Sequence, residues 1–158
     1  MVPGLSAPDR IVVDLDIAVD PQEVPAQQDV EQWVAAALAG LRTEAEVAIR
    51  IVDEAESAAL NHQYRQKPYA TNVLSFPCEL PPGVELPLLG DLAICAAVVQ
   101  REAHDQGKPL AAHWAHMVVH GVLHLVGFDH QDDAQAHTME SREVEILRAL
   151  GFANPYEA

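Results

Sequence analysis

The sequence predicts an α+β fold, in which a mixed four-stranded sheet packs with about five helices and one central helix carries several histidines. Four short segments alternate apolar with polar residues or are mostly apolar, as strands are. Segments with helical periodicity follow most of these strands, which is typical of a sheet covered by helices. A chain of 158 residues can form one substantial core, so we assign residues 1–158 to a single domain.

The first half of the chain contains two strands and two helices. Residues 10–19 and 44–53 alternate apolar and charged side chains, which predicts strands with one face in water. Residues 29–40 and 53–65 have helical periodicity, and Asp53 is a suitable cap for the second of these helices. Because a helix separates the two strands, we expect them to pair in parallel.

The third and fourth strands follow. We expect them at residues 72–80 and 88–96, and Pro77 indicates that the third strand lies at an edge or ends there. The loop between them is short, so they can pair antiparallel. A helix separates the second and third strands, which favours parallel pairing of those two as well.

Three helices complete the chain, at residues 96–106, 109–126 and 133–150. The middle one is long and apolar. Gly127 follows it and can end it with a tight turn.

Three histidines at the end of this long helix are spaced as metal ligands. In HGVLHLVGFDH, His124 follows His120 by four residues and precedes His130 by six. A separation of four places two imidazoles on one helix face, and the turn at Gly127 can carry the third back toward them. Three imidazoles leave one position of a tetrahedral zinc ion open for water, as in catalytic sites. We therefore predict a metal-dependent hydrolase with one Zn²⁺ per chain, although nickel and copper also suit three histidines.

Two further histidines lie on the same helix face. His113, His116, His120 and His124 fall within an arc of about 80°. One helical turn rises about 5.4 Å, so an ion near the last two cannot reach His113, for which we expect a structural role. His116 is a candidate for a hydrogen-bonding partner of the ligands or for a substrate contact.

A zinc peptidase is an alternative with the same ligand spacing. Peptidases with the pattern HExxHxxGxxH need a glutamate directly after the first histidine as general base. This chain has Gly121 there, which cannot transfer a proton, so the peptidase is the weaker alternative.

The histidine segment, with glycine in place of that glutamate, resembles the HGxLHLxGxDH signature of the YbeY family of bacterial metal-dependent endoribonucleases. Residues 60–77, LNHQYRQKPYATNVLSFP, resemble the family's LNxxYRxxxxxTNVLSFP block. Residues 88–95, LLGDLAIC, are similar to its Gly-Asp-Ile element, with Leu92 where isoleucine is commoner. The blocks occur in the family's order and, with the flanking helices, cover most of the chain after its N-terminal third.

The resemblance implies the same mixed sheet with the histidine helix packed centrally against it. It also implies that His120, His124 and His130 hold a zinc ion and that Arg65 is the catalytic arginine. The implied activity is cleavage of single-stranded RNA in ribosomal RNA maturation, at the 3′ end of 16S rRNA, and in ribosome quality control. An arginine suits this chemistry because its guanidinium binds phosphate oxygens bidentately.

The general base stays open between three candidates. They are a water activated by the ion, Asp129 beside His130, and a histidine of the long helix. Asp129 can instead orient a ligand imidazole, which is a common role of carboxylates near metal-bound histidines.

The charge of the chain is unusual for an RNA-binding protein. Nine basic against 24 acidic residues give a net charge of −15, whereas nucleic-acid binders usually carry a basic surface. Because Arg50, Arg65 and Lys67 lie near the motif segments, we expect a small positive cleft on an acidic body. The small ribosomal subunit and its assembly factors are then the expected partners that deliver the RNA, and no DNA is expected. A non-catalytic, metal-binding ribosome assembly factor remains the main alternative.

Nothing in the sequence predicts a membrane or secreted protein. No segment reaches the roughly 20 apolar residues of a membrane span, and the N-terminus lacks a basic region followed by an apolar run. Cys78 and Cys95 form neither a disulfide framework nor a CxxC site. We therefore expect a cytoplasmic protein.

Overall fold

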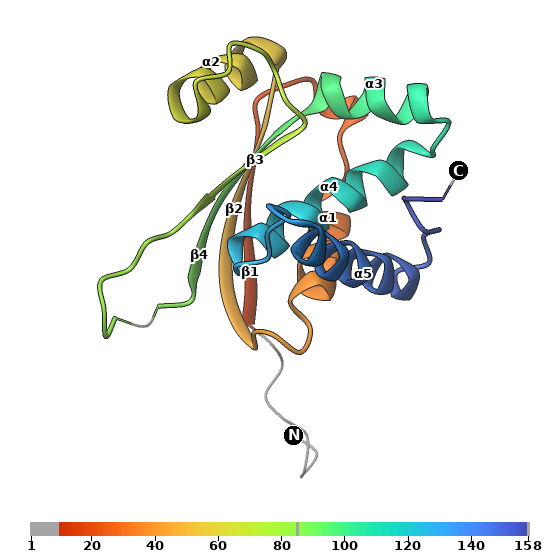
Figure 1. The fold of residues 1–158 in the computed structure, drawn as a ribbon. Coiled ribbons are helices and arrows are strands. Elements are labelled where there is room, and N and C mark those ends of the chain that lie inside the picture. The colour runs from red at the N-terminus through yellow and green to blue at the C-terminus, as the bar shows by residue number, and fades with distance from the viewer. Residues whose placement is uncertain (1–9, 85, 158) are drawn as a thin grey trace.

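The computed structural model describes residues 10–84 and 86–157, which form four strands and five α-helices (Figure 1). This confirms the predicted α+β fold. The strands are β1 (Arg10–Ile17), β2 (Glu44–Val52), β3 (Val73–Pro77) and β4 (Leu88–Cys95). The helices are α1 (Gln27–Leu38), α2 (Glu54–Arg65), α3 (Ala96–Gln106), α4 (Leu110–Leu125) and α5 (Asp133–Ala149), and a 3-10 turn, η1 (Pro21–Glu23), precedes α1.

The strand order in the sheet is β1-β2-β4-β3. The parallel pairing of β1 with β2 and the antiparallel pairing of β3 with β4 were predicted correctly. The predicted parallel pairing of β2 with β3 is wrong, because β4 lies between them and pairs in parallel with β2. Pro77 explains this order, since a strand that contains proline is confined to an edge and β3 can use only one side for pairing.

One face of the sheet carries the core. Alternate residues of β2, namely Ala45, Val47, Ile49 and Ile51, are buried on this face. Helices α1 and α4 pack against it and α5 packs against both helices, all on the same side in Figure 1. The opposite face is polar and more exposed, and α2 lies at its end.

Helix α4 lies at the centre of the helical layer and approaches the sheet closely. A side chain at Gly121 would place its Cβ 2.9 Å from the Leu92 methyl groups and 3.2 Å from Val73. The Ser75 hydroxyl donates to the Gly121 carbonyl at 3.3 Å. The lack of a side chain at position 121 therefore allows α4 to rest on β3 and β4.

The helix bounds follow the sequence closely. The Asp53 carboxylate accepts the Glu56 N–H at 2.8 Å and caps α2, as predicted. Helix α1 begins at Gln27, two residues earlier than expected, with Asp29 in its first turn. None of the helices in the described ranges has the length and apolar character that a membrane crossing needs. The N-terminal residues used to judge a signal peptide lie outside the described ranges.

Candidate active site

Three imidazoles meet beside the C-terminal end of α4. The ring centroids of His120 and His124 lie 4.7 Å apart, and that of His130 lies 5.7 Å from the first and 5.0 Å from the second. One ligand atom from each lies within 4.8 Å of the other two. The three histidines that their spacing was expected to bring together therefore do lie together, and the group can hold a metal ion.

The loop after α4 returns His130 to the other two histidines. Gly127 adopts φ +104°, a conformation that favours glycine, and reverses the chain. The Phe128 N–H donates to the Leu123 carbonyl at 3.0 Å, which closes the helix end. The Asp129 carboxylate accepts the His130 N–H at 2.8 Å, so this side chain holds the loop.

The donor set fits a divalent transition metal. Burial, and then the nearby charges of His120 and His130, lowers the pKa of His124 to about 4. Its imidazole is therefore neutral at neutral pH, which is the form that binds metals. Three neutral nitrogen donors are suited to Zn²⁺.

Sequence reasoning missed Glu143, which contacts His120 of this group and the neighbouring His116. Its side chain is 1 % exposed, and one carboxylate oxygen accepts from His120 Nδ1 at 3.0 Å and from His116 Nε2 at 3.1 Å. The Tyr156 hydroxyl donates to the other oxygen at 2.5 Å. Burial alone would raise the pKa of Glu143, but the hydrogen bonds from the two histidines outweigh it and lower the pKa to about 2. The carboxylate is therefore ionised and can only accept.

The remaining histidines of α4 lie outside the group of His120, His124 and His130. His116 is buried against Glu143 and Tyr156, so of its two expected roles the structure favours contact with a partner of the ligands. His113 lies farther back, with Nε2 2.9 Å from the Glu102 carboxylate, and burial lowers its pKa. Glu102 also accepts from the Asn72 side chain at 3.1 Å.

Hydrogen bonds between α2 and the segment that leads into β3 fix the end of the helix that carries Arg65. The buried Asn61 side chain donates to the Tyr69 carbonyl at 2.8 Å. The Ser57 hydroxyl accepts from the Thr71 N–H at 3.0 Å and donates to its carbonyl. Arg65 ends the helix, and its side chain forms no hydrogen bond or ion pair with any residue that the structure describes. Its guanidinium is therefore free to bind another partner.

Arg65 and the three histidines line one cleft of about 970 Å³. Its walls come from the end of α2, from β3 and the residues before it, and from the end of α4 with its following loop. Asn72 and Ser75 add polar groups to these walls, and Tyr64 and Phe76 add aromatic ones. Besides Arg65, the charged residues lining the cleft are Glu79 and Asp129.

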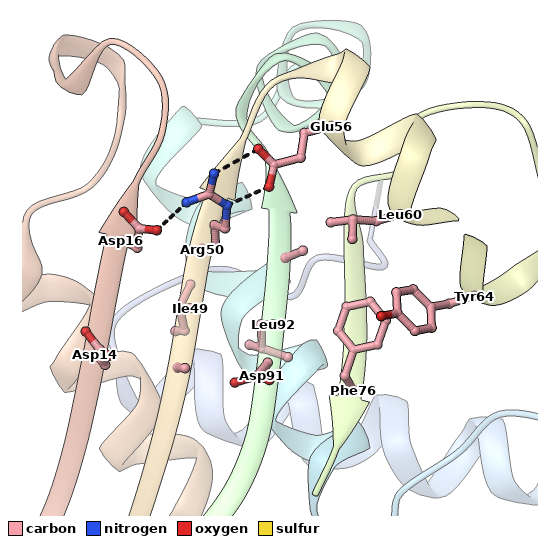
Figure 2. A pocket seen from close by; sticks show the side chains of 12 residues that line it. Asp14, Asp16, Ile49, Arg50, Glu56, Leu60, Tyr64, Phe76, Asp91 and Leu92 are labelled. Atoms are coloured by element: carbon pink, nitrogen blue, oxygen red, sulfur yellow. Dashed lines mark hydrogen bonds and ion pairs between the residues drawn. The ribbon is translucent and has the colours of Figure 1, made fainter. Parts of the chain in front are cut away.

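The expected contribution of Arg50 to a positive cleft is wrong. Arg50 lines a separate pocket of about 490 Å³ on the polar face of the sheet (Figure 2). It pairs there with Glu56 at 2.5 Å and with Asp16, and these two partners raise its pKa. The reason is the strand order, because β4 separates β2 from the edge strand that borders the cleft. Lys67 is also absent from the described lining of the cleft.

Two aromatic rings stand between the two pockets. The rings of Tyr64 and Phe76 meet edge to face with centroids 4.9 Å apart, and both residues line both pockets (Figure 2). Asp91, from the Gly-Asp block, lies on the sheet-face pocket instead of the cleft.

A family model described as Endoribonuclease YbeY matches residues 16–151. The chain belongs to this family. The solution structure of TM1509 from Thermotoga maritima is similar over 94% of this chain and 99% of that chain, with a TM-score of 0.57 and 20% sequence identity. At this identity the likeness shows a shared fold. The nuclease assignment comes from the YbeY family match.

Two of the three sequence blocks that resemble the YbeY signatures converge on the cleft. The block at residues 60–77 supplies Arg65 and the segment from Thr71 to Pro77, and the histidine block supplies the three histidines. The third block lies in β4, where Leu92 packs under Gly121. In this YbeY-family chain the block at residues 88–95 therefore forms the part of the sheet on which α4 packs, whereas the other two blocks face the cleft.

Proposed function

We propose that this chain is a zinc-dependent, single-strand-specific endoribonuclease that matures ribosomal RNA at the 3′ end of 16S rRNA and takes part in ribosome quality control. The family match supports the nuclease class. The observation that carries the proposal is that three imidazoles able to hold a metal ion line one cleft with an arginine that pairs with no described residue. In this proposal His120, His124 and His130 bind one zinc ion per chain.

Phosphodiester hydrolysis needs both kinds of group. A zinc ion on three histidines supplies a water of lowered pKa and polarises a phosphoryl oxygen. Arg65 binds the non-bridging oxygens and stabilises the negative charge that grows on them in the transition state. Asp129 is assigned to holding the His130 loop, because its carboxylate already accepts a backbone N–H of that loop.

The substrate in this proposal is unpaired RNA. Tyr64 is 58% exposed at the rim of the cleft, and aromatic rings of this kind stack on bases that are free of a duplex. The acidic body disfavours binding of bulk RNA. We therefore propose that the small ribosomal subunit and its assembly factors present the substrate in the cytoplasm.

The test is cleavage of a 3′-extended small-subunit rRNA fragment by identically prepared proteins. The variants are His124→Ala and Arg65→Ala, and the matched controls are His137→Ala and Arg148→Ala, two exposed residues of α5 outside the cleft. We expect each cleft variant to lose at least about 100-fold in rate, each control to keep the parent rate, and a chelator to abolish activity that zinc restores.

Equal cleavage by all five proteins would expose a contaminating nuclease and remove the support for this function. A parent protein that binds one zinc ion but cleaves no RNA, alone or with small subunits present, would favour the non-catalytic assembly factor instead.

A further inference from the structure

Glu143 occupies a core position on a largely polar helix. It lies four residues after the buried Met139 and three before the buried Ile146, on the side of α5 that faces α4. Burying a carboxylate is costly unless its lone pairs are satisfied and its charge is balanced. Its hydrogen-bond partners satisfy the lone pairs, but the negative charge of the carboxylate also needs a positive charge nearby.

No lysine or arginine of the described chain pairs with Glu143. Its ion-pair partners are the imidazoles of His116 and His120, which are charged only if protonated. A histidine that binds a metal is neutral. An ion that His120 would hold could therefore supply the balancing positive charge when the site is loaded.

We propose that Glu143 is a positioning residue of the metal centre, which fixes the proton of His120 on Nδ1 and presents its Nε2 to the ion. This inference rests on the metal site of the proposed function and deepens it. A Glu143 oxygen lies 3.0 Å from His120 Nδ1, where a carboxylate accepts the hydrogen of that nitrogen and leaves Nε2 for the ion. A carboxylate in this position also makes the ligand nitrogen more basic.

The C-terminal segment, residues 154–156, contributes to the same hydrogen-bond network. The Tyr156 hydroxyl donates to Glu143 at 2.5 Å and lies 3.2 Å from His116 Nε2. Its backbone N–H donates to the Asn154 side chain at 2.8 Å, and the Lys108 ammonium donates to the Pro155 carbonyl. These contacts fasten residues 154–156 to the loop between α3 and α4. The hydroxyl is thereby held where it orients the carboxylate.

The same groups could instead bind a second ion. Ligand atoms of His116, His120 and Glu143 also lie within 4.8 Å of one another. We favour the hydrogen-bonded arrangement because each carboxylate oxygen already has a donor, and the Tyr156 hydroxyl also lies 3.2 Å from His116 Nε2. Metal stoichiometry separates the two possibilities.

The experiment measures zinc affinity of the metal-free full chain by competition with a chromophoric chelator. Glu143→Gln should weaken binding 10–100-fold, as the loss of a carboxylate behind a ligand histidine does. Tyr156→Phe should weaken it by a smaller factor, about 3-fold to 10-fold, because the carboxylate remains but loses one donor. Glu145→Gln, an exposed change on the same helix, is the control and should bind zinc like the parent.

A second readout distinguishes positioning from a general effect on folding. Long-range ¹H–¹⁵N NMR of the zinc-loaded parent should show His120 protonated on Nδ1, and the same proton should broaden or shift in Glu143→Gln. The Co²⁺-substituted proteins should differ in their visible absorption for the same reason. If Glu143→Gln fails to fold, the affinity and the spectrum of Tyr156→Phe decide.

The outcomes separate this inference from the proposed function. A parent that binds one zinc ion with an affinity unchanged in folded Glu143→Gln and Tyr156→Phe would overturn the inference and leave the nuclease intact. Two ions per parent chain, one of them lost in Glu143→Gln, would also overturn it and assign a second metal site. A parent that binds no zinc would overturn the metal centre of the proposed function together with the inference.

Discussion

At the scale of single residues, His124 shows how the fold prepares a candidate metal ligand. It sits in the last turn of α4 with its ring partly buried between His120 and His130. Burial, followed by the charges of those two rings, lowers its pKa to about 4 from an ordinary value of 6.5. The lone pair needed for metal binding is thus available well below neutral pH.

This shift predicts a pH dependence of stability. As the pH falls, the unfolded chain protonates His124 near pH 6.5 and the folded chain only near pH 4. The contribution of a neutral His124 is therefore fully present above pH 6.5 and is lost toward pH 4. We expect the unfolding free energy of the metal-free protein to lose on the order of 2 kcal/mol across this window. Urea unfolding in a chelator at several pH values measures it.

The matched comparison uses two histidine variants. His124→Gln should flatten the decline in unfolding free energy, whereas His137→Gln, at an exposed position on α5, should keep it. An unchanged decline in His124→Gln would show that other groups cause the acid sensitivity.

Residue patterns predicted part of this site and not the rest. His120, His124 and His130 were predictable because helix geometry and a glycine turn relate their positions directly. Glu143 was not, since a glutamate on an amphipathic helix ordinarily faces water, and its one signal is its place in the apolar register of α5. Tyr156 carried no local signal, because it reaches His116 across 40 residues of sequence.

At the scale of elements, the strand order was the main error. Helices between strands correctly indicated a parallel core of the sheet, but they do not say which strands are neighbours. β4 is buried along most of its length and takes the interior place next to β2, whereas β3 ends in Pro77. Pro77 already indicated an edge strand with a single partner, which excludes pairing of β3 with β2 once β3 pairs with β4.

The junction of β3 and β4 contains a backbone constraint that can be tested. Gly90 adopts φ +142°, and the register between β2 and β4 shifts at this point. A Cβ there would lie 2.3 Å from the Phe76 carbonyl oxygen. We expect Gly90→Ala to lower the unfolding free energy by about 2–4 kcal/mol, because backbone strain and a backbone clash act together. Urea denaturation measures the loss.

Gly40→Ala is the control for this element. Gly40 also has a positive φ, of +79°, but nothing lies within 4 Å of its Cβ position. Its substitution should therefore cost only about 1 kcal/mol, the penalty of the backbone conformation alone. Equal losses in the two variants would mean that β3 moves freely away from β4 and that the close approach at Gly90 contributes nothing.

At the scale of the whole molecule, the net charge of −15 opposes an RNA substrate. The cleft offers Arg65 against two carboxylates, and Arg50 is already paired elsewhere. With zinc bound, the ion is the largest positive charge in the cleft. In the proposed function, attraction of RNA therefore comes mainly from the ion and one arginine, whereas the net charge of the chain opposes phosphate.

This distribution predicts a weak salt dependence of RNA binding. If the zinc-loaded protein neutralises only one to three phosphates, log Kd should rise with log salt with a slope of about 0.7 to 2, since each phosphate of a single strand contributes about 0.7. Salt also screens the repulsion by the acidic body, which reduces the slope further. Arg65→Ala should lower the slope by about 0.7, and Arg148→Ala, exposed on α5, should leave it unchanged.

Fluorescence anisotropy of a labelled single-stranded RNA between 50 and 300 mM KCl, read before cleavage begins, measures the slope. A slope above about 4 would require an extended basic surface on the chain, and recognition would then rest on many phosphate contacts instead of on the ion and Arg65.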